Sequence, residues 1–193
     1  GLLLKLENNK FWFAQGDGHL FGWYKAHSTD LDVEIKDPNV WVSQIQGPKS
    51  LELLNKIIDK PFIGNFKYFD WEEVSIASQK VIVSRTGFTN ELGWEIYISP
   101  DNDARKIGDL LLEEGTKMGM LLTASPGFRG RRIEAGLLSA GRDFTKDRNP
   151  FSVGLGKFID FDKGDFIGRD FLLNADKKCL TWGMRVENSF ALV

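Results

Sequence analysis

Residues 84–98 read SRTGFTNELGWEIYI, and this stretch decides the fold class. Two apolar-rich segments flank a short loop rich in turn-forming residues, which predicts a pair of strands. Because side chains alternate along a strand, the second segment presents one apolar face, made by Trp94, Ile96 and Ile98. Glu95 and Tyr97 lie on the opposite face. If the apolar face is the core, the Glu95 carboxylate points either to solvent or into a cleft.

Strands and helices are predicted on both sides of this stretch. The other predicted strands cover residues 2–6, 11–14, 32–36, 40–45, 66–71, 80–85, 157–161 and 180–186. The predicted helices cover 18–28 with Asp17 as its cap, a segment that follows Gly47-Pro48, 101–118 and 128–140, with a helical turn from Gly168. Strands and helices mix without a regular β–α alternation, which favours an α+β fold over a doubly wound parallel sheet.

The predicted helix over 128–140 contains RGRRIEAGLLSAG, residues 129–141. Helical spacing places Arg132, Gly136 and Ala140 on one stripe. Small residues beside an arginine leave room for a flat or anionic group to approach it. The alternative is a close helix–helix contact with a surface arginine, and the pattern alone does not decide between them.

Composition excludes several classes of protein. The 193 residues carry a net charge of −2 with both signs spread along the chain, so no basic nucleic-acid footprint is expected. The longest apolar runs are far too short to span a membrane. Cys179 is the single cysteine, which excludes an internal disulfide, and His19 and His27 are too few for a histidine-built metal centre. We expect a cytoplasmic protein.

Five segments occur in an order that carries a family resemblance. They are IQGPKS at 45–50, SRTGFTNELGWEIYI, RRIEAGLLSAGRD, NPFSVGLGKFI and KGDFIGRDFL. In this order they closely resemble motifs of the aminomethyltransferase family, the T-protein of the glycine cleavage system. IQGPKS and LLLKLENNKFWFAQGDGHLFGW are especially similar to the branch that contains dimethylsulfoniopropionate demethylase.

The resemblance implies a tetrahydrofolate-dependent transferase of an aminomethyl or methyl group from a small-molecule donor. It implies a folate-binding α+β unit over 1–172 and, over 173–193, a linker and the first strand of a C-terminal β-barrel. The chain is expected to be truncated at both ends. The family's catalytic aspartate would then lie upstream of residue 1, and the chain alone would be inactive. Uncovered strand edges would favour a homodimer.

The resemblance also assigns site residues. A carboxylate matching Glu95 binds the pterin ring, whose amino group and ring N–H are adjacent donors, and an arginine matching Arg132 lies at the same site. Phe88 and Ala140 each stand where the family has tyrosine, and Gln15 lies near a family asparagine. These differences indicate a branch with another one-carbon donor.

Two non-catalytic alternatives remain open. One is the folate-binding relative that supports iron–sulfur proteins, which carries a cysteine where this chain has Asp165. The other is a relative that has lost folate, which the changes at Phe88 and Ala140 would fit. The sequence does not identify the one-carbon donor.

Overall fold

The computed structural model describes residues 1–16, 20–62, 66–123 and 125–184. The chain forms two compact units, residues 1–137 and 138–193. The predicted division at residue 172, between a folate-binding unit and the start of a barrel, stays a prediction. The mixture of helices and antiparallel strands agrees with the predicted α+β class.

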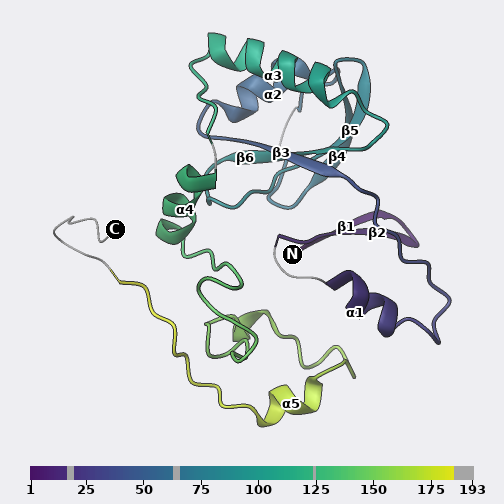
Figure 1. The fold of residues 1–193 in the computed structure, drawn as a ribbon, viewed down its shortest axis with the longest axis vertical. Helices are drawn as coiled ribbons and strands as arrows, with labels where there is room; N and C mark the ends of the chain where they lie inside the picture. The colour runs from purple at the N-terminus through teal and green to yellow at the C-terminus, as the bar shows by residue number, and fades with distance from the viewer. Residues whose placement is uncertain (17–19, 63–65, 124, 185–193) are drawn as a thin grey trace. The chain divides into compact units, whose positions relative to one another are not determined.

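A four-stranded antiparallel sheet is the centre of the first unit (Figure 1). Its strands are β3 (Trp41–Gln46), β4 (Trp71–Ile76), β5 (Gln79–Ser84) and β6 (Gly93–Ile98), in the order β3-β6-β5-β4. β4 and β5 form a hairpin whose two turn residues, Ala77 and Ser78, have φ of 50° and 63°. Positive φ at both positions matches the twist of paired strands.

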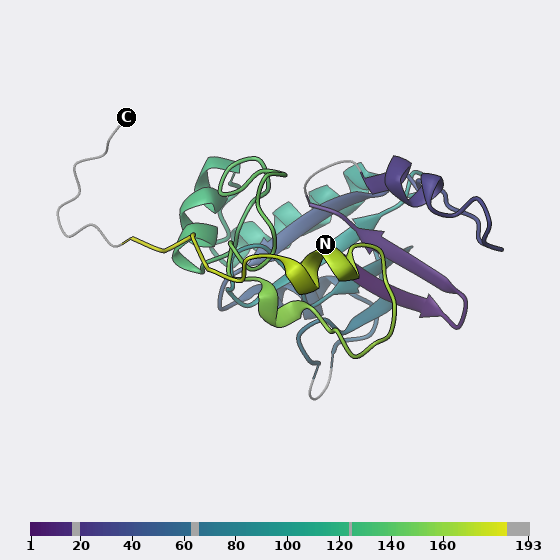
Figure 2. The same cartoon turned by 90° about the horizontal axis from the view of Figure 1, so that it is seen from below.

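Two helices cover one face of this sheet, α2 (Ser50–Ile57) and α3 (Ala104–Lys117) (Figures 1 and 2). The buried core between helices and sheet includes Leu53, Leu54, Ile57, Val83, Trp94, Ile96 and Ile107. Trp94 is only 1% exposed. The predicted core face of the strand at 94–98 is therefore confirmed.

A second, two-stranded sheet precedes the large one in the chain. It is the hairpin of β1 (Leu2–Glu7) and β2 (Lys10–Ala14), which confirms the strands predicted at 2–6 and 11–14. The Trp12 ring of β2 lies 6.2 Å from the ring of Tyr97 on β6. The hairpin therefore lies beside the sheet face that α2 and α3 leave uncovered. Helix α1 (Leu20–Ala26) follows, and Asp17, its predicted cap, lies outside the described residues.

The last helix of the first unit, α4 (Ser125–Glu134), ends earlier than predicted. Gly136 has φ of 71°, its N–H donates to Ile133 O, and the N–H of Leu137 donates to Arg132 O. This pair of bonds around a left-handed glycine is the Schellman motif, which ends a helix. The predicted stripe of Arg132, Gly136 and Ala140 on one helix is therefore wrong.

Other predicted strands are also corrected. Residues 32–36 form no strand. The strand predicted at 66–71 begins only at Trp71, because Phe69 has φ of 73° and the preceding residues form a turn held by the Asp70 carboxylate, which accepts from Lys67 N. Positive φ is incompatible with an extended strand.

The second unit contains a 3₁₀ helix, η1 (Gly156–Phe158), and the helix α5 (Arg169–Asn174). The helical turn predicted from Gly168 is confirmed, whereas the strand predicted at 157–161 is wrong. The strand predicted at 180–186 is absent from residues 180–184, the part of it that is described. There the N–H groups of Leu180 and Thr181 both donate to Ser152 O instead of pairing with a strand.

Candidate functional site

The predicted ligand-facing carboxylate, Glu95, lies at the centre of the sheet's uncovered face. On β3, Gln44 is its direct partner, and on β5 its partner is Ser84. Directly opposed residues of antiparallel strands point to the same face. Three polar side chains therefore form a row across three strands, on the side away from α2 and α3.

Hydroxyl groups hold the Glu95 carboxylate in place. The Thr86 hydroxyl donates to Oε2 of Glu95. The Tyr97 hydroxyl donates to the same oxygen at 3.2 Å. The Ser84 hydroxyl is hydrogen-bonded to that of Thr86. Since Thr86 belongs to the loop after β5 and Tyr97 to β6, two separate parts of the chain fix this side chain.

Tyr97 is buried, with 4% of its surface exposed. Burial raises the pKa of its phenol to about 12, and the nearby negative charge of Glu95 adds to the increase. The phenol is therefore protonated at neutral pH and acts as a hydrogen-bond donor to Glu95.

The loop at 85–92, between β5 and β6, is anchored on two sides. The Thr89 hydroxyl donates to Oε1 of Gln46 at 2.7 Å, and Gln46 also accepts from Nε2 of Gln44 at 2.9 Å. On the other side, Nη1 of Arg131 in α4 lies 3.9 Å from Oε1 of Glu91. The ion pair places α4 beside the loop that carries Thr86.

The structure partly groups the other predicted site residues with Glu95. Phe88 lies in the loop at 85–92, two residues from Thr86, and is 39% exposed. Arg132 lies in α4, is 6% exposed, and its Nη1 donates to Leu137 O at 2.9 Å. Its helix contacts the same loop through Arg131. A cleft shared by Glu95 and Arg132 stays a prediction.

Gln15 and Ala140 have other surroundings. Oε1 of Gln15 accepts from Leu20 N at 3.2 Å, so this side chain binds the first turn of α1. Ala140 belongs to the second unit, where it is exposed and pairs with Phe144 in an isolated bridge. Their predicted roles toward folate stay predictions.

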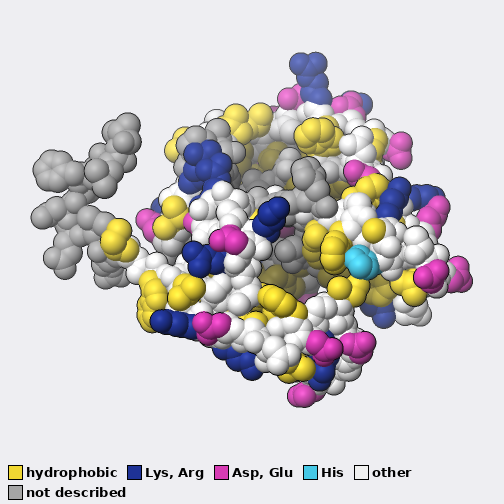
Figure 3. Space-filling model, turned by 60° about the horizontal axis from the view of Figure 1, so that its bottom comes forward, with side chains coloured by type: hydrophobic (Ala, Val, Ile, Leu, Met, Phe, Trp, Pro, Cys, Tyr) yellow, Lys and Arg dark blue, Asp and Glu magenta, His cyan; other side chains and the backbone are white. Residues whose placement is uncertain are grey.

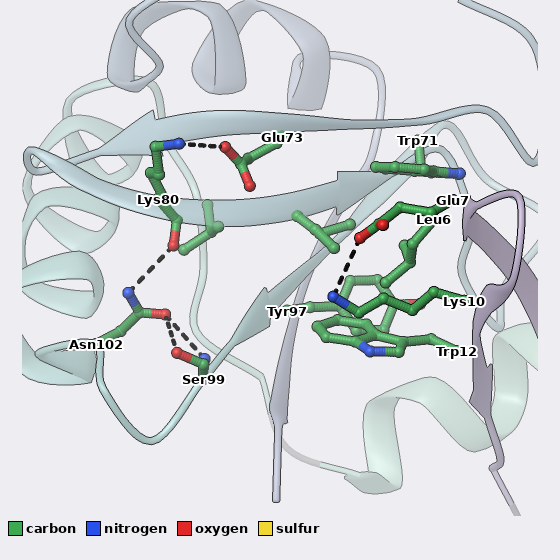
Figure 4. Close-up of a pocket in the computed structure, with 12 residues that line it drawn as sticks. Leu6, Glu7, Lys10, Trp12, Trp71, Glu73, Lys80, Tyr97, Ser99 and Asn102 are labelled. Atoms are coloured by element: carbon green, nitrogen blue, oxygen red, sulfur yellow. Dashed lines mark hydrogen bonds and ion pairs between the residues drawn. The ribbon is translucent and has the colours of Figure 1, made fainter. Parts of the chain in front are cut away.

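An open cavity of about 310 Å³ lies next to Tyr97, between the β1–β2 hairpin and the sheet (Figure 4). Its aromatic lining residues are Trp12, Trp71 and Tyr97. Its two lysines are paired, Lys10 with Glu7 at 3.3 Å and Lys80 with Glu73 at 2.7 Å. The charges in this cavity therefore offset one another.

Three further observations concern metal ligands, surface charge and the length of the helices. Among the described residues, no group of three or more histidine, cysteine, aspartate or glutamate side chains is placed to hold a metal ion. On the face shown in Figure 3, basic and acidic side chains are interspersed. None of the helices in the described part of the chain is both long and apolar enough to cross a membrane.

Sequence reasoning identified Glu95 but did not assign roles to Thr86 and Ser84. The alternation of residues along β6 had placed Tyr97 on the same face as Glu95, so its contact was accessible from the pattern. The contact of Thr86 depends on how the loop turns back over β6, for which the sequence carries no periodic signal.

Comparison with known sequences now gives the family. The sequence model of the GCVT N-terminal domain matches residues 1–163. The chain belongs to this family. The matched range includes the polar face around Glu95 and the helix α4. The predicted resemblance to aminomethyltransferases is confirmed.

Curated relatives carry two kinds of name. An aminomethyltransferase of Caldanaerobacter subterraneus subsp. tengcongensis is 36% identical over 93% of this chain and 49% of its own length. One of Thermoanaerobacter sp. is 34% identical over 93% and 50%. A dimethylsulfoniopropionate demethylase of Ruegeria pomeroyi is 28% identical over 90% and 47%. The chain thus spans about half the length of these relatives.

Proposed function

We propose that this chain forms the folate-binding part of a tetrahydrofolate-dependent one-carbon transferase, and that the sheet face around Glu95 receives the pterin ring. The observation that carries the proposal is the position of the Glu95 carboxylate. Thr86 and Tyr97 hold it on the sheet face opposite to the one that α2 and α3 cover. Membership of the aminomethyltransferase family supports the reaction class.

The residues fit the chemistry of a pterin. Its exocyclic amino group and neighbouring ring N–H are donors, and a carboxylate is an acceptor with several lone pairs. Hydrogen bonds to an ionised acceptor are roughly twice as strong as neutral ones. Phe88, half-exposed in the adjacent loop, offers an aromatic surface for a flat ring. Arg132 and the α4 helix are proposed as a further wall of this site.

When bound, tetrahydrofolate supplies the nitrogen atoms that accept the one-carbon unit. The donor is proposed to be a small molecule that carries an aminomethyl or methyl group, on nitrogen or on a sulfonium. Glu95 orients the folate and does not itself react.

Calorimetric titration of the 193-residue chain with 5-formyltetrahydrofolate tests the proposal. We expect saturable binding, weakened by Glu95→Gln by about 1–3 kcal/mol, the scale of a lost charge-assisted hydrogen bond. Glu52→Gln is the matched control, because Glu52 is an exposed carboxylate on α2 at the opposite face of the sheet. Equal affinity of the Glu95 and Glu52 variants would overturn the pterin role.

A further inference from the structure

We propose that Thr86 and Tyr97 are positioning residues for the pterin site, which hold Oε2 of Glu95 so that Oε1 is presented to the ligand. The inference rests on the proposed function and assigns how its central carboxylate is oriented. Neither residue is expected to touch the pterin.

The two carboxylate oxygens of Glu95 differ in their hydrogen-bond partners. Both donors, the Thr86 hydroxyl and the Tyr97 hydroxyl, bind Oε2. Among the described residues, none donates to Oε1. A carboxylate held through one oxygen by two donors from different directions has little freedom to rotate, so its second oxygen keeps a constant direction.

The chain of hydroxyl groups from Ser84 through Thr86 to Glu95 has a defined direction. A hydroxyl has one proton, and that of Thr86 is used in its bond to Glu95. In the bond between Ser84 and Thr86, the donor must therefore be Ser84. The protons of Ser84 and Thr86 then both point along the chain toward the carboxylate, and such aligned hydrogen bonds strengthen one another.

The two donors to Glu95 are themselves fixed in place. Tyr97 is buried and packs beside Trp12, and its raised pKa keeps its proton in place. Thr86 is also buried, with 5% exposed, and is tied to Ser84, which is fully buried. The carboxylate is thus ordered before a ligand arrives, so less conformational entropy is lost on binding.

The experiment is a double-mutant cycle measured by calorimetry with 5-formyltetrahydrofolate. We expect Thr86→Val and Tyr97→Phe each to weaken binding by roughly 3- to 30-fold, the scale of one hydrogen bond. Thr86→Ser keeps the hydroxyl and should restore most of the affinity. Thr116→Val on α3, which removes an exposed hydroxyl at the far face of the sheet, should leave it unchanged.

The cycle separates positioning from a general loss of structure. In the Glu95→Gln background, Thr86→Val should have little further effect, because its target is already altered. Additive losses in the double variant would overturn the positioning role. Unchanged affinity of Thr86→Val, with binding weakened by Glu95→Gln, would overturn this inference alone. Absence of binding by the unmodified chain would overturn the proposed function and, with it, the positioning role.

Discussion

The side-chain amide of Gln79 makes two hydrogen bonds to the backbone of Asp103, one as donor and one as acceptor. Nε2 of Gln79 donates to Asp103 O at 3.2 Å, and Asp103 N donates to Oε1 of Gln79. Asp103 in turn caps α3, because its carboxylate accepts from Lys106 N at 3.2 Å. The start of β5 therefore fixes the point at which the long helix begins.

Asp103→Ala removes this cap and leaves a backbone N–H at the start of α3 without its side-chain partner. We expect the free energy of unfolding to fall by about 0.5–2 kcal/mol. Urea denaturation followed by circular dichroism measures it. Asp101→Ala, an exposed change in the same turn, is the control and should have a clearly smaller effect. Similar losses in the two variants would contradict the capping role.

Gly93 on β6 leaves little room for a side chain. A Cβ added there would lie 3.1 Å from Ile45 O and 3.2 Å from Cβ of Gln46, both on the paired strand β3. Gly93→Ala should therefore destabilise the first unit by about 1–3 kcal/mol, as overpacking does. Gly108→Ala is the counterpart, because Gly108 lies within α3 with no neighbour within 4 Å.

Gly108→Ala should stabilise the chain by about 0.5–1 kcal/mol, since alanine is a better helix former. The same denaturation experiment compares the two variants. The two substitutions are expected to change the free energy of unfolding in opposite directions. A destabilising Gly108→Ala or a neutral Gly93→Ala would contradict the described packing at these two glycines.

Leu54 is the most completely buried residue of α2, with 0% exposed. Leu54→Ala leaves a cavity between α2 and the sheet, and we expect a loss of about 2–5 kcal/mol in the free energy of unfolding. Leu121→Ala provides the control, because Leu121 is 86% exposed. A loss below 1 kcal/mol for Leu54→Ala, within the usual range of surface changes, would show that this helix does not pack as described.

Tyr97 predicts an alkaline limit to stability. Its pKa is raised from 10.0 to about 12 in the folded chain, so the folded state keeps its proton where the unfolded state loses it. The resulting stabilisation is fully present below pH 10 and is lost as pH rises to about 12; two pKa units correspond to on the order of 2–3 kcal/mol. Tyr97→Phe should make the free energy of unfolding fall less steeply with pH over this range, as denaturation curves recorded at several pH values would show. An unchanged dependence of stability on pH would contradict the raised pKa of Tyr97.

Much of the first unit was predictable because its segments have clear periodicity. Alternation along β6 identified both the core face and the position of Glu95. The spacing of apolar residues identified α2, whereas α3 was predicted from Asp101 as a helix start and Gly119 as a helix stop. Two of the failures lie where one backbone angle decides the outcome. Phe69 favours strands by type but adopts positive φ, and Gly136 ends α4 within a stretch that otherwise has helical composition.

The candidate site was predictable only in its central residue. Glu95 followed from the strand pattern and the family resemblance, whereas Thr86 reaches it from a loop whose path depends on tertiary contacts with Gln46 and α4. Gln15 binds the start of α1 because its side chain is close to that helix in sequence. Homodimerisation through chain ends stays a prediction.

The strand order β3-β6-β5-β4 has a consequence for the sequence of folding events. β4 and β5 are neighbours in the chain and close through a two-residue turn, a process that takes microseconds in isolated hairpins. β3 pairs with β6 across the whole segment between Gln46 and Gly93, and closing so long a loop costs more entropy. We therefore expect β3 to pair with β6 late, after α2 has packed against the sheet. The row of Gln44, Glu95 and Ser84 would be completed only in that final step.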